Sequence, residues 1–90
     1  MPRIIPVISL EDFVAKAKKP LMFKTLVTNI AEGIKENLQS VNVAEIKNHD
    51  IIINVSRSEW EGGLNKALEF YIEREEYEEC SKIKKLINKL

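Results

Sequence analysis

Residues 64–90 read LNKALEFYIEREEYEECSKIKKLINKL, and this stretch predicts two amphipathic helices folded back on each other. Apolar residues recur at helical spacing in two stripes: Leu64, Ala67, Leu68, Tyr71 and Ile72 in the first, and Tyr77, Cys80, Ile83, Ile87 and Leu90 in the second. The polar run Glu73–Glu76 separates the stripes and indicates the turn. We therefore expect an αα-hairpin over residues 58–90, whose apolar faces must pack on the rest of the chain or on a partner.

The charges of the second predicted helix follow its dipole. Glutamates crowd its start and lysines occupy its later turns: Glu75, Glu76, Glu78 and Glu79, then Lys82, Lys84, Lys85 and Lys89. Acid at the N-terminus and base at the C-terminus each stabilise a helix by roughly 0.3–1 kcal/mol. Glu78 and Lys82 are also spaced as a favourable i,i+4 ion pair.

Two further helices are predicted upstream. Ser9 is placed as an N-cap for a short helix over about residues 10–18, which Pro20 ends. The same Pro20 suits the first turn of a long core helix that reaches Leu38 with apolar residues at i, i+3, i+4 and i+7. Gly33 lies inside this helix, where glycine is unfavourable, and indicates a close neighbour.

A small β-element is expected between these helices and the hairpin. Asn42–Ile46 and Ile51–Val55 have strand composition, and the segment Lys47–Asp50 between them is turn-like. The N-terminal run Arg3–Ile8 is apolar and β-branched, but Pro6 restricts it to an edge strand or an extended lead-in. The sequence thus predicts a β-hairpin to which the N-terminal run could add a third strand.

The third long helix has two alternative starts. Ser56 with Glu59 forms a capping box, with Val55 and Trp60 placed as a hydrophobic staple, and Ser58 offers a second box with Glu61 two residues later.

Five residues of this region are candidate contacts to another protein: Trp60, Gly63, Leu64, Tyr71 and Tyr77. Tryptophan and tyrosine are enriched at binding hot spots, and glycine permits close approach of another backbone. The alternative for Trp60 is that it serves only the staple and the core.

Length and composition restrict the function. Ninety residues predict one domain over 1–90, and 14 basic against 14 acidic residues give no overall field towards nucleic acid or an anionic membrane. No run of apolar residues approaches membrane-spanning length, and the N-terminus is a poor signal peptide. A single cysteine fits a reducing compartment, so we expect a cytoplasmic protein.

No motif for catalysis, for a cofactor or for a metal is recognised. Gly62-Gly63 does not have the spacing of a phosphate loop, and His49 has only carboxylates near it in the sequence. Cys80 falls on an apolar stripe and is expected to be buried. The glutamates of Glu69–Glu79 are expected to form a solvated face.

Basic residues define the alternative function. They cluster at two predicted helix ends: Lys16, Lys18 and Lys19, and Lys82, Lys84, Lys85 and Lys89. Either cluster could contact phosphate in a small nucleic-acid-binding regulator, although no aromatic residue interleaves them as a stacking platform for single strands would require.

The last 27 or so residues resemble the UVR helical hairpin of nucleotide-excision-repair proteins. Tyr77 matches the aromatic residue after the turn, Cys80 and Ser81 the pair of small residues, and Lys82–Lys84 the basic–apolar–basic step; Ile87 and Leu90 match the closing apolar positions. The resemblance implies protein–protein pairing, one hairpin packing on another, without catalysis.

Together these observations predict an α+β, mostly α fold. The predicted function is that of a non-enzymatic adaptor or regulator, which binds another protein through the hairpin and the adjoining Trp60–Gly63 edge. Homodimerisation is a companion prediction, since small domains gain stability from extra burial.

Overall fold

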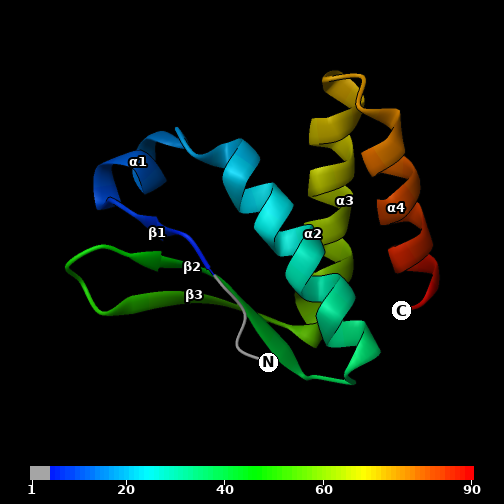
Figure 1. Cartoon of the computed structure of the whole chain (residues 1–90), viewed down its shortest axis with the longest axis horizontal. Coiled ribbons are helices and arrows are strands. Elements are labelled where there is room, and N and C mark those ends of the chain that lie inside the picture. The colour runs from blue at the N-terminus through cyan, green and yellow to red at the C-terminus, as the bar shows by residue number, and fades with distance from the viewer. Residues whose placement is uncertain (1–4) are drawn as a thin grey trace.

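A computed structural model describes residues 5–90, and it has a three-stranded sheet and four helices. The elements run in this order: β1 Val7–Ile8, α1 Leu10–Ala15, α2 Lys19–Lys35, β2 Ser40–Ile46, β3 Ile51–Ser56, α3 Arg57–Glu73 and α4 Tyr77–Asn88. The predicted α+β, mostly α fold with a β-hairpin and a C-terminal helix pair is confirmed (Figure 1).

The sheet has the order β1-β2-β3, with β1 parallel to β2 and β2 antiparallel to β3. The β-hairpin is therefore confirmed, and the predicted third strand forms at Val7–Ile8; residues 3 and 4 of that run lie outside the described residues. A register shift between Asn42 and Ala44 makes both Val43 and Ala44 buried. This bulge explains why the sequence of β2 alternates imperfectly.

The helices gather at one end of the sheet. Helix α2 packs on β2, α3 packs on α2, and α4 packs along α3. Figure 1 shows α2, α3 and α4 near the end of the sheet where β3 runs into α3, whereas α1 lies towards the hairpin turn. The turn end of the β-hairpin therefore projects from the helical body.

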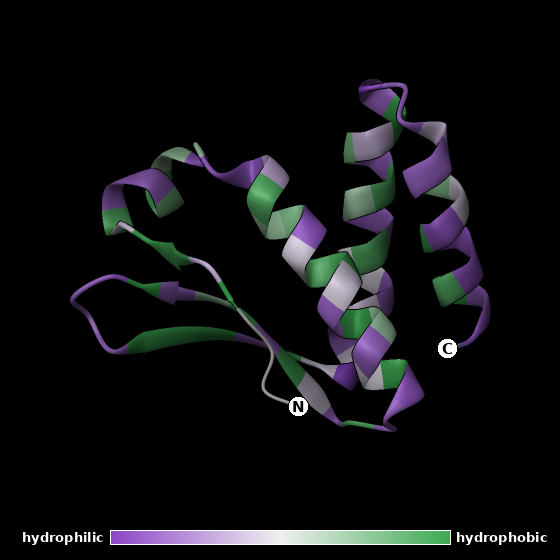
Figure 2. Cartoon of the chain, viewed as in Figure 1, coloured by the Kyte–Doolittle hydropathy of each residue, from purple (hydrophilic) through white to green (hydrophobic). Residues whose placement is uncertain are grey.

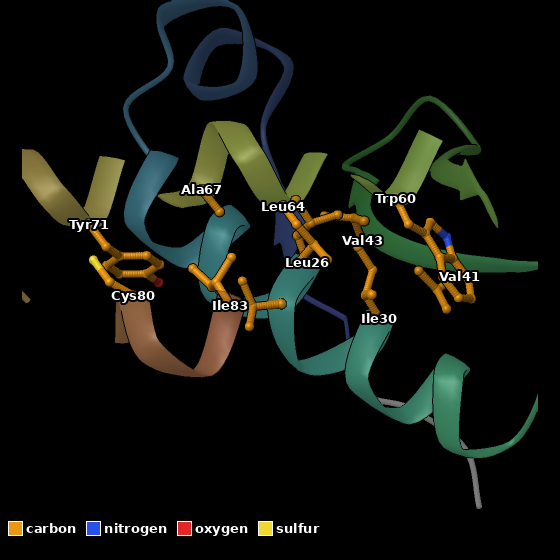
Figure 3. Close-up of a cluster of buried hydrophobic side chains, with 11 residues drawn as sticks. Leu26, Ile30, Val41, Val43, Trp60, Leu64, Ala67, Tyr71, Cys80 and Ile83 are labelled. Carbon is orange, nitrogen blue, oxygen red and sulfur yellow. The ribbon is translucent and has the colours of Figure 1, made fainter. Parts of the chain in front are cut away.

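The buried side chains form a continuous row from the sheet to the hairpin (Figure 3). Trp60 and Val41 lie at the sheet end of this row, and Tyr71 and Cys80 lie at the other end. Gly33 has the close neighbour that its position in α2 predicts, and this neighbour is Trp60. A Cβ added at Gly33 would lie 2.7 Å from Trp60 Cη2. Only glycine lets α2 approach the indole ring this closely.

Three helices end in the same way, with a left-handed residue that is not glycine. Lys16, Asn37 and Glu75 have φ of 58°, 57° and 58°, and the next residue of each donates its N–H to the carbonyl five positions earlier. These are Schellman motifs. The motif at Lys16 ends α1 at Ala15, so the prediction of a helix to about residue 18 that Pro20 ends was wrong. The motif at Glu75 makes the predicted turn between α3 and α4.

The N-terminal caps follow the predictions. The Asp12 N–H donates to Ser9 Oγ at 3.1 Å at the start of α1. At the start of α3 the Ser56–Glu59 capping box forms, and the hydrogen bonds from the Ser56 hydroxyl and N–H lower the pKa of Glu59. The predicted ion pair between Glu78 and Lys82 was wrong. Lys82 pairs with Glu79 instead, at i,i+3, and its Nζ lies 3.3 Å from Glu79 Oε1.

Candidate functional site

The five sequence-predicted contacts occupy different environments. Trp60 and Leu64 are 0% exposed, Tyr71 is buried, and Gly63 packs against Leu26, whereas Tyr77 is 65% exposed. The indole of Trp60 points inward because its Nε1 donates to the Val55 carbonyl at 2.9 Å. Trp60 of the predicted Trp60–Gly63 edge is therefore part of the core, whereas Glu61 and Gly62 are exposed. Tyr77 alone of the five candidates offers most of its side chain to a partner.

The centre of the hairpin's apolar face is covered within the chain, whereas Ile72, Tyr77 and Leu90 of the two predicted stripes are exposed. Cys80 and Ile83 are buried in the same cluster as Leu64 and Ala67 of α3 and Leu26 of α2. The outward side of α4 is polar and carries the exposed lysines Lys82, Lys84, Lys85 and Lys89. A second hairpin pairing on this apolar face, as the UVR resemblance implies, would have to displace the packing seen here.

A groove of about 730 Å³ with a mainly apolar lining lies on the helix-bearing side of the sheet. Four elements besides the sheet contribute to it, namely α1, the loop after it, α2 and α3. Its apolar lining consists of Phe13, Val14, Met22, Phe23, Leu26, Val43, Ile53, Val55 and Phe70. We call this feature the α1–α3 groove.

Two phenylalanines in tilted ring contact lie in the α1–α3 groove. The ring centroids of Phe23 and Phe70 are 5.0 Å apart, and both side chains are half-buried. The ammonium of Lys19 lies 5.8 Å from each ring centroid, and the Arg74 guanidinium lies 5.2 Å from that of Phe70. Aromatic residues, phenylalanine included, are enriched at protein–protein interfaces, and cations attract the faces of their rings.

The rim of the groove is charged on two sides. Lys16 and Lys19 lie on one wall, and Lys66, Glu69 and Glu73 of α3 lie on the other. The N-terminal lysine cluster of the sequence thus belongs partly to this rim.

Helix α1 is the element that sequence reasoning misread. The sequence predicts its start but not its end or its exposure: no residue of α1 is fully buried, and Val14 is 71% exposed. The groove itself was not predicted, because its walls come from segments far apart in the sequence.

The polar side chains that line the α1–α3 groove are lysines and glutamates. Among residues 5–90 no group of three His, Cys, Asp or Glu side chains could hold a metal ion. His49 is exposed on the hairpin turn and Cys80 is buried in the core, so neither lines the groove.

Tyr71 should make the protein sensitive to alkaline pH. Burial, and then the nearby carboxylates of Glu79 and Glu76, raise the pKa of this phenol above its ordinary value. In the unfolded chain the group ionises near pH 10, so the stability it contributes is present below that pH and is lost as pH rises through the higher folded value. We expect the free energy of unfolding to fall above about pH 10 less steeply in Tyr71→Phe than in wild type. Urea titrations between pH 8 and 11 measure this; parallel slopes would contradict it.

The helices of residues 5–90 are all too short or too polar to cross a membrane. No family model, curated protein or solved structure matches this chain, so the likeness of its last residues to the UVR hairpin stays a prediction.

Proposed function

We propose that this protein is a non-enzymatic adaptor of the cytoplasm that binds an amphipathic helix of another protein in the α1–α3 groove. The single observation that carries the proposal is the groove itself, which has a volume of about 730 Å³ and mainly apolar and aromatic lining, in a chain of 90 residues. Grooves of this volume with such a lining are typical of binding sites.

A helix suits this groove because of the layer that it would complete. One face of a sheet is normally covered by helices, about 10 Å away. Here α2 covers β2, but Ile53 and Val55 of β3 remain half-buried on the floor of the groove. An amphipathic helix with apolar residues at i, i+3, i+4 and i+7 would cover this floor and contact Phe23 and Phe70.

The rim charges specify the flanks of that helix. Lys16 and Lys19 favour acidic residues on the side that faces α1 and the start of α2. The α3 wall carries both signs, with Lys66 beside Glu69 and Glu73, and favours mixed charge there. The proposed site still involves the C-terminal hairpin, because α3 supplies one wall of the groove.

The test compares two exposed positions, one in the groove and one outside it. Val14→Glu adds a charge at a groove position that is 71% exposed, and Tyr77→Glu adds one at the first position of α4, 65% exposed. Neither side chain is in the core, so both variants should keep the circular dichroism spectrum and melting temperature of the wild type. Tagged proteins are used for capture from lysate of the source cell after nuclease treatment, and a photo-crosslinker at position 14 identifies the bound segment by mass spectrometry.

We expect a partner that wild type and Tyr77→Glu capture and Val14→Glu does not, with a crosslink to an amphipathic helical segment bearing acidic residues. Loss of capture with Tyr77→Glu alone would place the binding surface on the hairpin and overturn the groove proposal. Recovery of nucleic acid that washes off with salt would overturn it in favour of the lysine clusters.

A further inference from the structure

Strand β3 has a free edge with unusual composition. It is the last strand in the order β1-β2-β3, and no strand of residues 5–90 pairs with its other side. Its six residues, IIINVS, include no proline, glycine or charged residue. Natural edge strands use proline and charged residues to avoid pairing with another chain. Figure 2 shows β3 green over most of its length, beside a purple turn.

Two isoleucines on opposite faces of β3 are exposed. Ile51 is 47% exposed and Ile52 is 50% exposed. Ile53 and Val55 line the groove on one face of β3. Ile52 and Asn54 lie on the opposite face, away from the helices, where Asn54 Nδ2 donates to Asn42 Oδ1 at 2.9 Å. A neighbouring strand would cover apolar side chains on both faces at once.

We infer that β3 pairs antiparallel with β3 of a second copy of this chain, to form a six-stranded sheet about a two-fold axis. This contact is made through the backbone edge of β3, whereas side chains on one face of β3 line the α1–α3 groove, and the inference does not depend on the groove's proposed role.

The charges at the two ends of β3 favour this partner and this direction. Asp50 directly precedes the strand, and α3 begins directly after it at Arg57. Antiparallel self-pairing brings each Asp50 to the positive N-terminus of the other copy's α3. Parallel pairing would place Asp50 beside Asp50 instead, and like charges repel.

The arrangement of the helices leaves room for the contact. Figure 1 shows α2, α3 and α4 at the end of the sheet where β3 enters α3, with the hairpin turn projecting from the other end. In the antiparallel dimer the two helical bodies therefore lie at opposite ends of the joined sheet. The other edge strand, β1, has only two residues and offers little to pair with.

The interface is small, so the dimer should be weak. One six-residue strand pair falls in the class of interfaces below about 1,200 Å² that serve transient association. We expect a dissociation constant in the micromolar range or above, about 1 µM to 1 mM.

Sedimentation equilibrium of the isolated protein over that concentration range tests the inference. Ile52→Lys places a charge at the edge, on the face away from the groove, and should weaken the dimer at least about tenfold. The matched control is Val7→Lys, which makes the same kind of change at a 60% exposed position of the other edge strand and should leave the dimer unchanged.

Hydrogen exchange of the wild type provides a readout that needs no variant. Exchange of the β3 amides should slow as the concentration rises, while that of the β1 amides should not. A monomer throughout the range, a dimer that Ile52→Lys does not weaken, or concentration-independent exchange in β3 would each overturn the inference. Loss of the dimer in Tyr77→Glu but not in Ile52→Lys would place the contact on the hairpin.

Discussion

Trp60→Ala is expected to lower the free energy of unfolding by about 3–5 kcal/mol or more. The indole is 0% exposed, and its Nε1 donates to the Val55 carbonyl at 2.9 Å. Removing a buried tryptophan costs about 3–5 kcal/mol, and the unpaired carbonyl adds to this loss. A domain of this size has a total stability of about 5–15 kcal/mol, so this loss is a large fraction of the whole. Urea titration followed by circular dichroism at 222 nm measures the change without relying on tryptophan fluorescence.

Glycine variants test the same contact from the other side. Gly33→Ala would place a Cβ 2.7 Å from Trp60 Cη2 and 3.0 Å from Val41 Cγ1. Overpacking costs about 1–3 kcal/mol, which exceeds the gain of about 0.5–1 kcal/mol in helix propensity, so destabilisation is expected. Gly62→Ala is the matched control, because nothing lies within 4 Å of an added Cβ there, and it should stabilise the protein. A mild effect of Trp60→Ala, or stabilisation by both alanines, would contradict the packing of the indole on α2.

Ile83→Ala should destabilise the protein by about 2–5 kcal/mol, even at concentrations too low for association. Ile83 is 0% exposed on α4 and packs in the cluster that includes α2 and α3. Urea titration at low micromolar concentration measures this loss in the free energy of unfolding. The result shows whether α4 buries Ile83 within one chain. A hairpin that is covered only by a partner would lose little stability in the isolated monomer.

The control for Ile83→Ala is Ile72→Ala. Ile72 is also an apolar residue of the hairpin stripes, but it is 47% exposed on α3. Ile72→Ala should lower the free energy of unfolding by less than about 1 kcal/mol, because the side chain of Ile72 buries less apolar area on folding than that of Ile83. Equal effects of the two substitutions would indicate that α4 does not dock as the structure shows.

The identity of the elements was largely determined by local sequence. Periodicity fixed the helices of the hairpin, and the polar run at Glu73–Glu76 marked the turn that the left-handed Glu75 makes. The Ser56–Glu59 capping box set the start of α3, and Gly33 indicated a close neighbour that proved to be Trp60. The periodicity, the turn and the cap depend on residues within about one helical turn, so they are readable from sequence, whereas the identity of the neighbour of Gly33 is not.

The end of α1 was not readable in the same way. A Schellman motif at Lys16 ends this helix, and it needs a left-handed residue that sequence usually supplies as glycine or asparagine. Lysine at this position gives no such signal, whereas Pro20 gives a strong but misleading one.

Only the tertiary structure decided which apolar surfaces remain exposed. The sequence marks Trp60 and Leu64 as apolar or aromatic residues near a helix start, but whether such residues lie in a core or at an interface depends on what packs over them. Here α2 covers both, whereas Val14 and the floor of the α1–α3 groove have no helix above them. Likewise, that β3 is an edge follows from the pairing order of three strands. Local sequence determined the elements of this protein, and long-range packing determined its surfaces, because burial depends on contacts between segments far apart in the chain.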